Sequence, residues 1–121
     1  MKKSRILGSA AVLALMSASV ASAAEYRVIV LQSLTGPAAF IGAAFADGAR
    51  LAEAQINASG VLGAGNTLSV EYADDATDRT QTMSLIARYA SDPNVLAILG
   101  PTSGAVAIAG ASSANELEIP V

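Results

Sequence analysis

The sequence has 121 residues, of which 53% are hydrophobic, 14% charged and 4% aromatic, and this length allows at most one small domain. It contains no cysteine, histidine or tryptophan, so no disulfide framework supports its fold. Three of its seven basic residues lie among the first five positions, which leaves four basic against ten acidic residues and a net charge of −6 for the remainder. That balance argues against nucleic acids and anionic membrane surfaces as partners.

The N-terminus has the three parts of a secretory signal peptide. Lys2, Lys3 and Arg5 precede an almost uncharged apolar run over residues 6–20, and the small residues Ala21-Ser22-Ala23 follow it. The run of about 15 residues is shorter than the roughly 20 that a membrane-spanning helix needs. We therefore predict a signal peptide over residues 1–23 with cleavage after Ala23. An uncleaved membrane anchor is the alternative.

The expected mature chain, residues 24–121, has no cysteine at the cleavage site to accept a lipid, so we expect a soluble protein and not a lipoprotein. A soluble exported protein stays with its cell only where a second membrane confines it. We therefore expect this chain in the periplasm, with free secretion as the alternative.

The first predicted strand is Tyr26–Leu31, a short apolar run rich in β-branched residues, as in strands that are covered on both faces. Residues 33–37 end it. From Ile41 onward apolar residues recur at helical spacing, and Gly60 is placed to cap that helix. The apolar face of the helix is expected at Ile41, Phe45, Gly48, Ala52 and Ile56, and its opposite face at Asp47, Arg50, Glu53 and Asn57.

The next two predicted elements are an edge strand and a helix. Residues 67–73 alternate between apolar and polar or small side chains, which favours a strand at the edge of a sheet. Asp78 and Gln81 form the start of a capping box, so a helix begins there, and Ser91-Asp92-Pro93 ends it. Its apolar stripe is expected at Met83, Ile86, Ala87 and Ala90.

The remaining elements complete an alternating pattern. Val95–Leu99 is fully apolar and is expected to be a central strand, residues 100–104 form a turn, and a helix follows. Its apolar positions are Val106, Ala109, Gly110, Ser113 and Leu117. Ile119–Val121 is expected to begin a fourth strand, and an interior strand that has barely begun indicates a fragment. The order βαβαβαβ with short connections predicts a doubly wound parallel α/β sheet with strand order 2-1-3-4.

In such a sheet ligands bind beyond the carboxyl ends of the strands where the strand order reverses, here between the first and third strands. The loops at that point consist of small, hydroxyl-bearing, Gly and Pro residues. Because the free amides and the dipole at the start of the third helix favour an anion, we expect an anion to bind there. The candidate ligand-binding residues of the two loops are Ser33, Thr35, Gly36, Thr102, Ser103, Gly104 and Ala105. An ordinary strand-to-helix turn is an equally open interpretation.

The composition of these loops indicates which class of anion they could bind. Neither contains Lys or Arg, and because a phosphate is usually met by a cation, a single carboxylate fits better. Phe40 and Ile41 are candidates for an apolar wall beside a ligand side chain, although for Ile41 we favour a place in the helix core.

Several other functions lack support in the sequence. The loops match neither the G-x-G-x-x-G spacing nor the G-K-[ST] ending of a P-loop, which argues against nucleotide binding.

Asp74, Asp75 and Asp78 match the Asp-Asp-x-x-Asp string of prenyl synthases but follow a strand. We interpret Asp74 and Asp75 as a solvated turn and Asp78 as a helix cap, with calcium binding as the alternative. The expected mature chain has no His, Cys or Lys to activate a serine, so we predict no enzyme, no metal and no cofactor.

The order and spacing of several short motifs resemble the branched-chain amino acid binding proteins of ABC transporters. They are Val28-Ile29-Val30-Leu31, Leu34-Thr35-Gly36-Pro37, Gly48-Ala49-Arg50-Leu51-Ala52, Ile56-Asn57-Ala58, Gly60-Val61-Leu62-Gly63, Glu71-Tyr72-Ala73-Asp74-Asp75, Gly100-Pro101-Thr102-Ser103-Gly104 and Glu118-Ile119-Pro120-Val121. No single motif is specific, but together they extend over essentially all of residues 24–121.

The resemblance implies a two-lobed periplasmic protein that closes on an amino acid or related carboxylate or amide and delivers it to an ABC permease in the inner membrane. Residues 24–121 would then be the N-terminal part of the first lobe. In that family a serine and backbone amides after the third strand hold the ligand carboxylate, which maps onto Thr102 to Ala105. The usual serine position falls on Gly104, next to Ser103, and this departure bears on ligand identity. A ligand-sensing regulatory domain of the same fold is the alternative.

Overall fold

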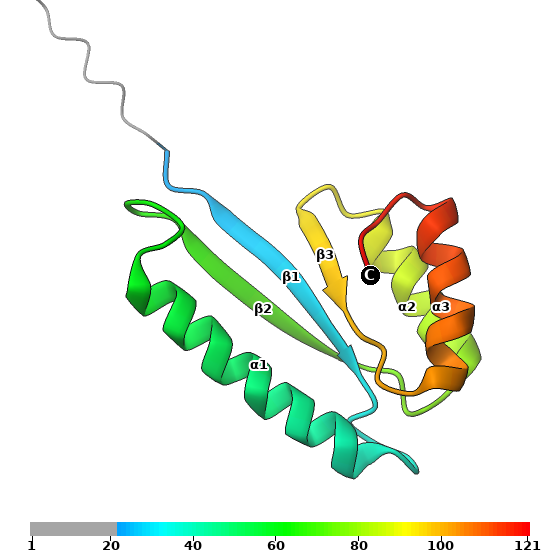
Figure 1. Cartoon of the computed structure of the whole chain (residues 1–121). Helices are drawn as coiled ribbons and strands as arrows, with labels where there is room; N and C mark the ends of the chain where they lie inside the picture. Colours follow the sequence, from blue (N-terminus) through cyan, green and yellow to red (C-terminus); the bar gives the residue numbers. More distant parts are fainter. Residues whose placement is uncertain (1–21) are drawn as a thin grey trace, which may run out of the picture.

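The structure is a computed structural model that describes residues 22–121, so almost all of the predicted signal peptide lies outside it. Strands and helices alternate along the described chain, as the sequence predicts (Figure 1). The elements are β1 (Glu25–Gln32), α1 (Ala39–Ser59), β2 (Thr67–Asp74), α2 (Arg79–Ala90), β3 (Val95–Leu99) and α3 (Gly104–Glu116).

The three strands form one parallel sheet in the order β2-β1-β3, which confirms the first three positions of the predicted order. β1 pairs with β2 along its whole length, from Glu25 opposite Thr67 to Gln32 opposite Asp74. β2 is an edge strand, as predicted. The central strand of the described residues is β1, and β3, predicted to be central, lies at the other edge.

The predicted fourth strand is not formed within the described residues. Residues 119–121 have no strand conformation, and the backbone contact of this segment with β3 is a hydrogen bond from the Ile98 amide to the Pro120 carbonyl, 2.9 Å. The described fold is therefore a βαβαβα unit of the predicted doubly wound α/β class, and residues 119–121 lie beside β3 without strand conformation.

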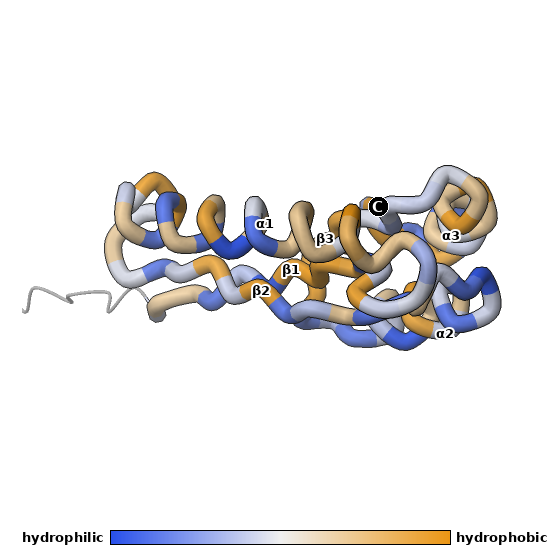
Figure 2. Tube along the Cα trace, turned by 90° about the horizontal axis from the view of Figure 1, so that it is seen from below, coloured by the Kyte–Doolittle hydropathy of each residue, from blue (hydrophilic) through white to orange (hydrophobic). Residues whose placement is uncertain are grey.

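The helices lie on both faces of the sheet, with α1 above the strands and α2 below them in Figure 2. Apolar side chains of β1 and β3 meet those of α2 and α3 in the main core. The core consists of Ile29, Leu31, Ala73, Ile86, Tyr89, Val95, Ile98 and Ala114. Ile29 and Leu31 are completely buried because β1 is paired on both sides and covered on both faces.

α1 packs on the sheet through its small residues, which corrects the predicted apolar face. Gly42 and Ala46 are its buried residues, whereas Phe45 is 58% exposed and Gly48 and Ala52 are exposed. α1 is so rich in alanine that two apolar stripes have helical spacing, and the stripe of small residues allows the closer approach to the strands. The predicted cap is confirmed, since Gly60 ends α1 in a left-handed conformation, φ 68°.

The face of α1 that was expected opposite the core contacts the edge strand β2. Glu53 accepts a hydrogen bond from the Val70 amide at 3.0 Å, and Asn57 bonds both the amide and the carbonyl of Leu68 at 2.7 and 2.9 Å. These side chains satisfy backbone groups on the free edge of β2, which would otherwise be open to pairing with another strand.

The stripe that α2 buries differs from the predicted one by about one residue. Ile86 is buried as predicted, but its neighbours in the interior are Thr82 and Tyr89, while Met83 is 42% exposed. Hydrogen bonds explain the polar members: the Thr82 hydroxyl donates to the Asp78 carbonyl and the Tyr89 hydroxyl donates to Glu71, 2.8 and 2.7 Å. In α3, Val106 and Gly110 are buried as predicted, together with Ala114.

A charged cluster joins β1 and β2 to α2 and the segment that follows it. Arg27 of β1 forms ion pairs with Glu71 of β2 and with Asp92, which follows α2. Hydrogen bonds from Arg27 and then Tyr89 lower the pKa of Glu71, and bonds from the Asn94 amide and then Arg27 lower the pKa of Asp92. Three elements that are distant in sequence are thus linked by one guanidinium.

We predict that this cluster makes stability depend on acidity. The folded-state pKa values of Glu71 and Asp92 lie below their ordinary 4.5 and 3.8, so their contribution is complete above those values and is lost as the pH falls through and below them. Urea-unfolding midpoints of Arg27→Met should therefore fall less steeply than wild type between about pH 7 and pH 3. Arg79→Met is the control, since Arg79 forms no ion pair within residues 22–121. An unchanged acid dependence in Arg27→Met would contradict the assignment.

Candidate ligand-binding site

The carboxyl ends of β1 and β3 lie side by side because the two strands are parallel neighbours. The β1–α1 loop (residues 33–38) and the β3–α3 loop (residues 100–103) leave the sheet there and lead to α1 and α3 (Figure 1). This is the point of strand-order reversal at which doubly wound sheets bind ligands. The structure thus brings the two predicted loops together.

The start of α3 presents backbone amides with no acceptor within the described residues. Ser103 is the N-cap in an extended conformation, and its carbonyl accepts from the amides of Val106 and Ala107 at 3.0 and 2.8 Å. Its hydroxyl forms no capping hydrogen bond. The amides of Gly104 and Ala105, at the positive end of the helix dipole, are therefore available to an anion. A methyl group added at Gly104 would meet nothing within 4 Å, so a ligand has room to approach.

Three buried polar atoms at the carboxyl end of the sheet have no hydrogen-bond partner among residues 22–121: Thr102 Oγ1, Gln32 Oε1 and Asp75 Oδ2. The Gln32 side chain is at the end of β1, its residue is 3% exposed, and its Nε2 donates to the Leu99 carbonyl at 3.3 Å. Gln32 is not among the residues that the sequence pattern indicates. Its one signal is that a long polar side chain follows an otherwise apolar strand.

The β1–α1 loop differs from the β3–α3 loop because most of its donors are already bonded to the turn after β2. The Leu34 and Thr35 amides donate to Asp74 Oδ1 at 2.9 and 3.1 Å, and the Thr35 hydroxyl donates to Asp74 Oδ2 at 2.6 Å. Ser33 is completely buried, and its hydroxyl donates to Asp75 at 2.6 Å. The hydroxyls of Ser33 and Thr35, which the sequence offers to a ligand, therefore bond to the turn after β2.

Asp74 and Asp75 do not form the solvated turn that the sequence suggested. Asp75 is completely buried and Asp74 is partly buried, because both carboxylates face the β1–α1 loop. Burial would raise the pKa of Asp74, but hydrogen bonds from the Thr35 hydroxyl and from three amides outweigh it and hold this pKa below its usual value. The cap is confirmed, since Asp78 accepts from the Gln81 amide at 2.7 Å. No group of three or more acidic side chains in residues 22–121 could hold a metal ion.

The two candidate wall residues lie at the start of α1. Phe40 is 77% exposed, and its role beside a ligand stays a prediction. Ile41 is 38% exposed, so its interpretation as a core residue is wrong.

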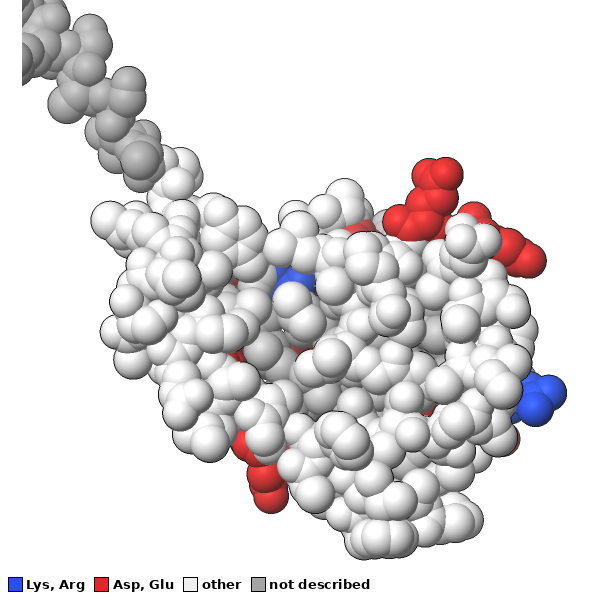
Figure 3. Space-filling view, viewed as in Figure 1, with Lys and Arg blue, Asp and Glu red and all other residues white. Residues whose placement is uncertain are grey.

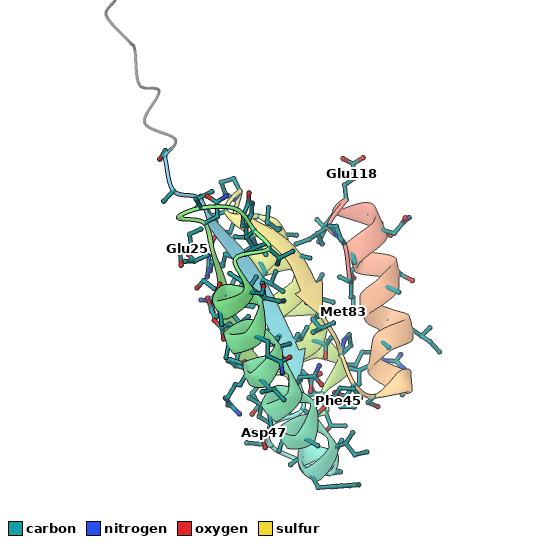
Figure 4. All side chains as sticks on the ribbon, turned by 60° about the vertical axis from the view of Figure 1, so that its left-hand side comes forward. Glu25, Phe45, Asp47, Met83 and Glu118 are labelled. Carbon is teal, nitrogen blue, oxygen red and sulfur yellow. The ribbon has the colours of Figure 1, made fainter. Side chains whose placement is uncertain are left out.

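A separate apolar groove of about 410 Å³ lies between α1 and the end of β3. It is lined by Ala44, Phe45, Gly48, Ala49, Ala52 and Leu99. Phe45 and Asp47 leave α1 on opposite sides (Figure 4), and the face seen in Figure 3 has few charged side chains, most of them near its rim. The groove offers hydrophobic contact but few groups that could orient a polar ligand.

Comparison with known proteins assigns the fold. A model described as periplasmic binding protein matches residues 25–121. The chain belongs to the periplasmic binding protein family. No curated protein sequence matches it. Members of this family bind substrates and are not enzymes.

Solved structures place this periplasmic binding protein among the type I members. A proposed branched-chain amino acid ABC transporter protein from Rhodospirillum rubrum is 31% identical and matches 81% of the chain with a TM-score of 0.73. LivJ from Streptococcus pneumoniae, solved with isoleucine, is 25% identical over 79% of the chain, TM-score 0.72. The leucine-binding protein LivK from Thermotoga maritima is 26% identical over 78%, TM-score 0.69.

The chain spans only 28%, 27% and 26% of those three structures. The matched part has the parallel α/β architecture that the sequence predicts. None of the helices in residues 22–121 has the length and apolar character needed to cross a membrane.

We predict that Gly36→Ala destabilises the protein more than Gly60→Ala. Both glycines have positive φ, 79° and 68°, so alanine is strained at each. A methyl group at Gly36 would also lie 2.5 Å from the Ala76 carbonyl oxygen, whereas one at Gly60 meets nothing within 4 Å. Chemical denaturation should show an additional loss of about 1–3 kcal/mol for Gly36→Ala, the range of overpacking. Equal losses would contradict the close contact between the two loops.

Proposed function

We propose that this periplasmic binding protein is the solute-binding component of an ABC uptake system for branched-chain or related amino acids, or for related small carboxylates or amides. Its partner would be an ABC permease in the inner membrane. The proposal includes export to the periplasm by a signal peptide cleaved after Ala23, as a soluble protein.

The observation that carries the proposal is the open start of α3. The amides of Gly104 and Ala105 have no acceptor in the described chain, and the Ser103 hydroxyl beside them forms no capping bond. Neither loop contains Lys or Arg, which suits a singly charged carboxylate better than a phosphate. Isoleucine in LivJ and leucine for LivK are ligands with such a carboxylate, and this supports the ligand class.

The two loops contribute differently under this proposal. Thr102, Ser103, Gly104 and Ala105 would hold the ligand carboxylate. Ser33, Thr35, Gly36 and Phe40 would shape the neighbouring wall, with the hydroxyls of Ser33 and Thr35 bonded to Asp75 and Asp74. Groups that recognise the ligand ammonium lie, by the resemblance, in parts of the protein beyond these residues.

We predict that Ser103→Ala weakens the binding of L-leucine, L-isoleucine or L-valine to the full-length protein by about 1–3 kcal/mol, because a buried carboxylate loses a hydrogen bond. Gly104→Leu should weaken it at least as much by filling the space in front of the amides. Isothermal titration calorimetry measures both effects. Neither change removes a side-chain contact seen in residues 22–121, so thermal stability should stay close to wild type.

The matched control is Ala111→Leu, at an exposed position farther along α3, which should leave affinity unchanged. L-leucinamide, which lacks the carboxylate, should bind more weakly than L-leucine. Unchanged affinity in both Ser103→Ala and Gly104→Leu would remove the start of α3 from the site. Failure of the wild-type protein to bind any of the three amino acids would overturn the proposed ligand class.

A further inference from the structure

We propose that Asp74 and Asp75 are positioning residues that hold the β1–α1 loop in its ligand-binding conformation without touching the ligand. This inference rests on the proposed function, since it assigns the loop's shape to residues outside the site. We call residues 74–77, between the end of β2 and the residue that caps α2, the aspartate clasp.

Asp74 organises the backbone of the loop. It accepts from the amides of Leu34 and Thr35 and from the Thr35 hydroxyl, and a further bond from the Ala76 amide at 2.8 Å keeps the carboxylate in place. One side chain thus satisfies three donors of a loop that is about forty positions earlier in the sequence. Bonds to an ionised acceptor are the stronger kind.

Asp75 holds the beginning of the loop from the interior. Its Oδ1 accepts from the Ser33 hydroxyl at 2.6 Å and from the Thr77 amide at 2.8 Å, and both Asp75 and Ser33 are completely buried. Its backbone amide donates to the Gln32 carbonyl at 3.1 Å, which extends the pairing of β1 and β2 past their last residues. The carboxylate therefore ties the exit of β1 to the exit of β2.

The rest of the clasp contacts the other half of the loop. Thr77 Oγ1 accepts from the Ala38 amide at 3.3 Å, just before α1 begins. Ala76 and Thr77 both have positive φ, 51° and 61°, a rare conformation for residues with a side chain, and this turn brings the Ala76 carbonyl against Gly36. The loop is therefore held at Ser33, Leu34, Thr35, Gly36 and Ala38 by four consecutive residues.

This arrangement predicts an effect on affinity that exceeds the effect on stability. Among residues 22–121 the Thr35 amide and hydroxyl have no acceptor besides Asp74, whereas the Leu34 amide also donates to the Gln32 carbonyl at 3.0 Å and the carbonyls of Gly36 and Ala38 accept from amides at the start of α1. Loss of the clasp therefore frees chiefly the first part of the loop, around Thr35, while the core between the sheet and α2 and α3 stays packed. If the loop then spends only a fraction of its time in the binding conformation, the apparent dissociation constant rises by the inverse of that fraction.

The test compares Asp74→Ala with Asp78→Ala in the full-length protein. Asp78 lies in the same turn but caps α2 through the Gln81 amide and has no side-chain bond to the β1–α1 loop. Both variants lose stability, so both are measured by calorimetry with L-isoleucine well below their melting temperatures. We expect about a tenfold higher dissociation constant for Asp74→Ala, with loop occupancy near one tenth, and less than a twofold change for Asp78→Ala.

Amide hydrogen exchange is the second measurement. A residue that only stabilises the whole fold would, when removed, not increase the exchange of the β1–α1 loop amides alone. The Thr35 amide, and to a lesser extent the Leu34 amide, which also donates to the Gln32 carbonyl, should exchange faster in Asp74→Ala than in Asp78→Ala when core amides are equally protected. Asp74→Asn keeps an oxygen for the amide donors and should restore most of the affinity.

Each outcome decides the question. Wild-type affinity in Asp74→Ala, or equal losses in Asp74→Ala and Asp78→Ala, would overturn the inference while leaving the proposed function intact. A loss in Asp74→Asn as large as in Asp74→Ala, with Leu34 and Thr35 still protected, would also overturn it, because the carboxylate would then act on the ligand directly. If wild type binds no amino acid, the proposed function fails instead, and the exchange of Leu34 and Thr35 alone tests the clasp.

Discussion

The structure depends on the pairing of β1 with a parallel neighbour on each side. Ile29, Val30 and Leu31 are almost completely excluded from solvent, because β2 and β3 take the backbone hydrogen bonds and the helices cover the two faces. A strand buried in this way cannot bind a ligand along its length. Its carboxyl end, where the backbone leaves the sheet, is the position at which it can contribute to a site, and the chain places its loops of small residues there.

The two loops at this end differ in whether their hydrogen-bond donors already have acceptors. Most donors of the β1–α1 loop are bonded to the carboxyl groups of Asp74 and Asp75 at the end of β2. The β3–α3 loop has no acidic or basic residue and leaves the first amides of α3 without an acceptor in the described chain. Under the proposed function, the ligand carboxylate would therefore bind on the β3–α3 side of the strand-order reversal. With free amides in both loops, the sheet end would not distinguish the two charged ends of the amino acid that we propose as ligand.

Sequence periodicity predicted the elements well, because β1, β3 and the turns are specified by local composition. The apolar run that became β1 and the Gly60 cap need no knowledge of distant residues. The contacts of Asp74 and Asp75 could not be predicted in this way. A pair of aspartates after a strand is usually solvated, and what buries this pair is a loop about forty positions earlier that comes close only when β1 and β2 align in register. Gln32 was missed for the same reason, since its partner is the carbonyl of Leu99 in another strand.

The prediction of which face of α1 is buried was wrong because α1 has two apolar stripes. Helical periodicity identifies both stripes but does not show which of them the neighbouring sheet can cover. Gly42 and Ala46 took the contact with the strands because only small side chains permit it, which left Phe45 on the side of Leu99. The same side includes the open edge of β3, where the Ile98 amide bonds to Pro120. On the β3 side, apolar residues whose spacing predicts burial are therefore exposed. On the β2 side, the polar side chains of Glu53 and Asn57 bond the free backbone groups of the edge strand. An edge finished by hydrogen-bonding side chains suits contact with water, and an edge flanked by bulky apolar residues suits contact with further protein.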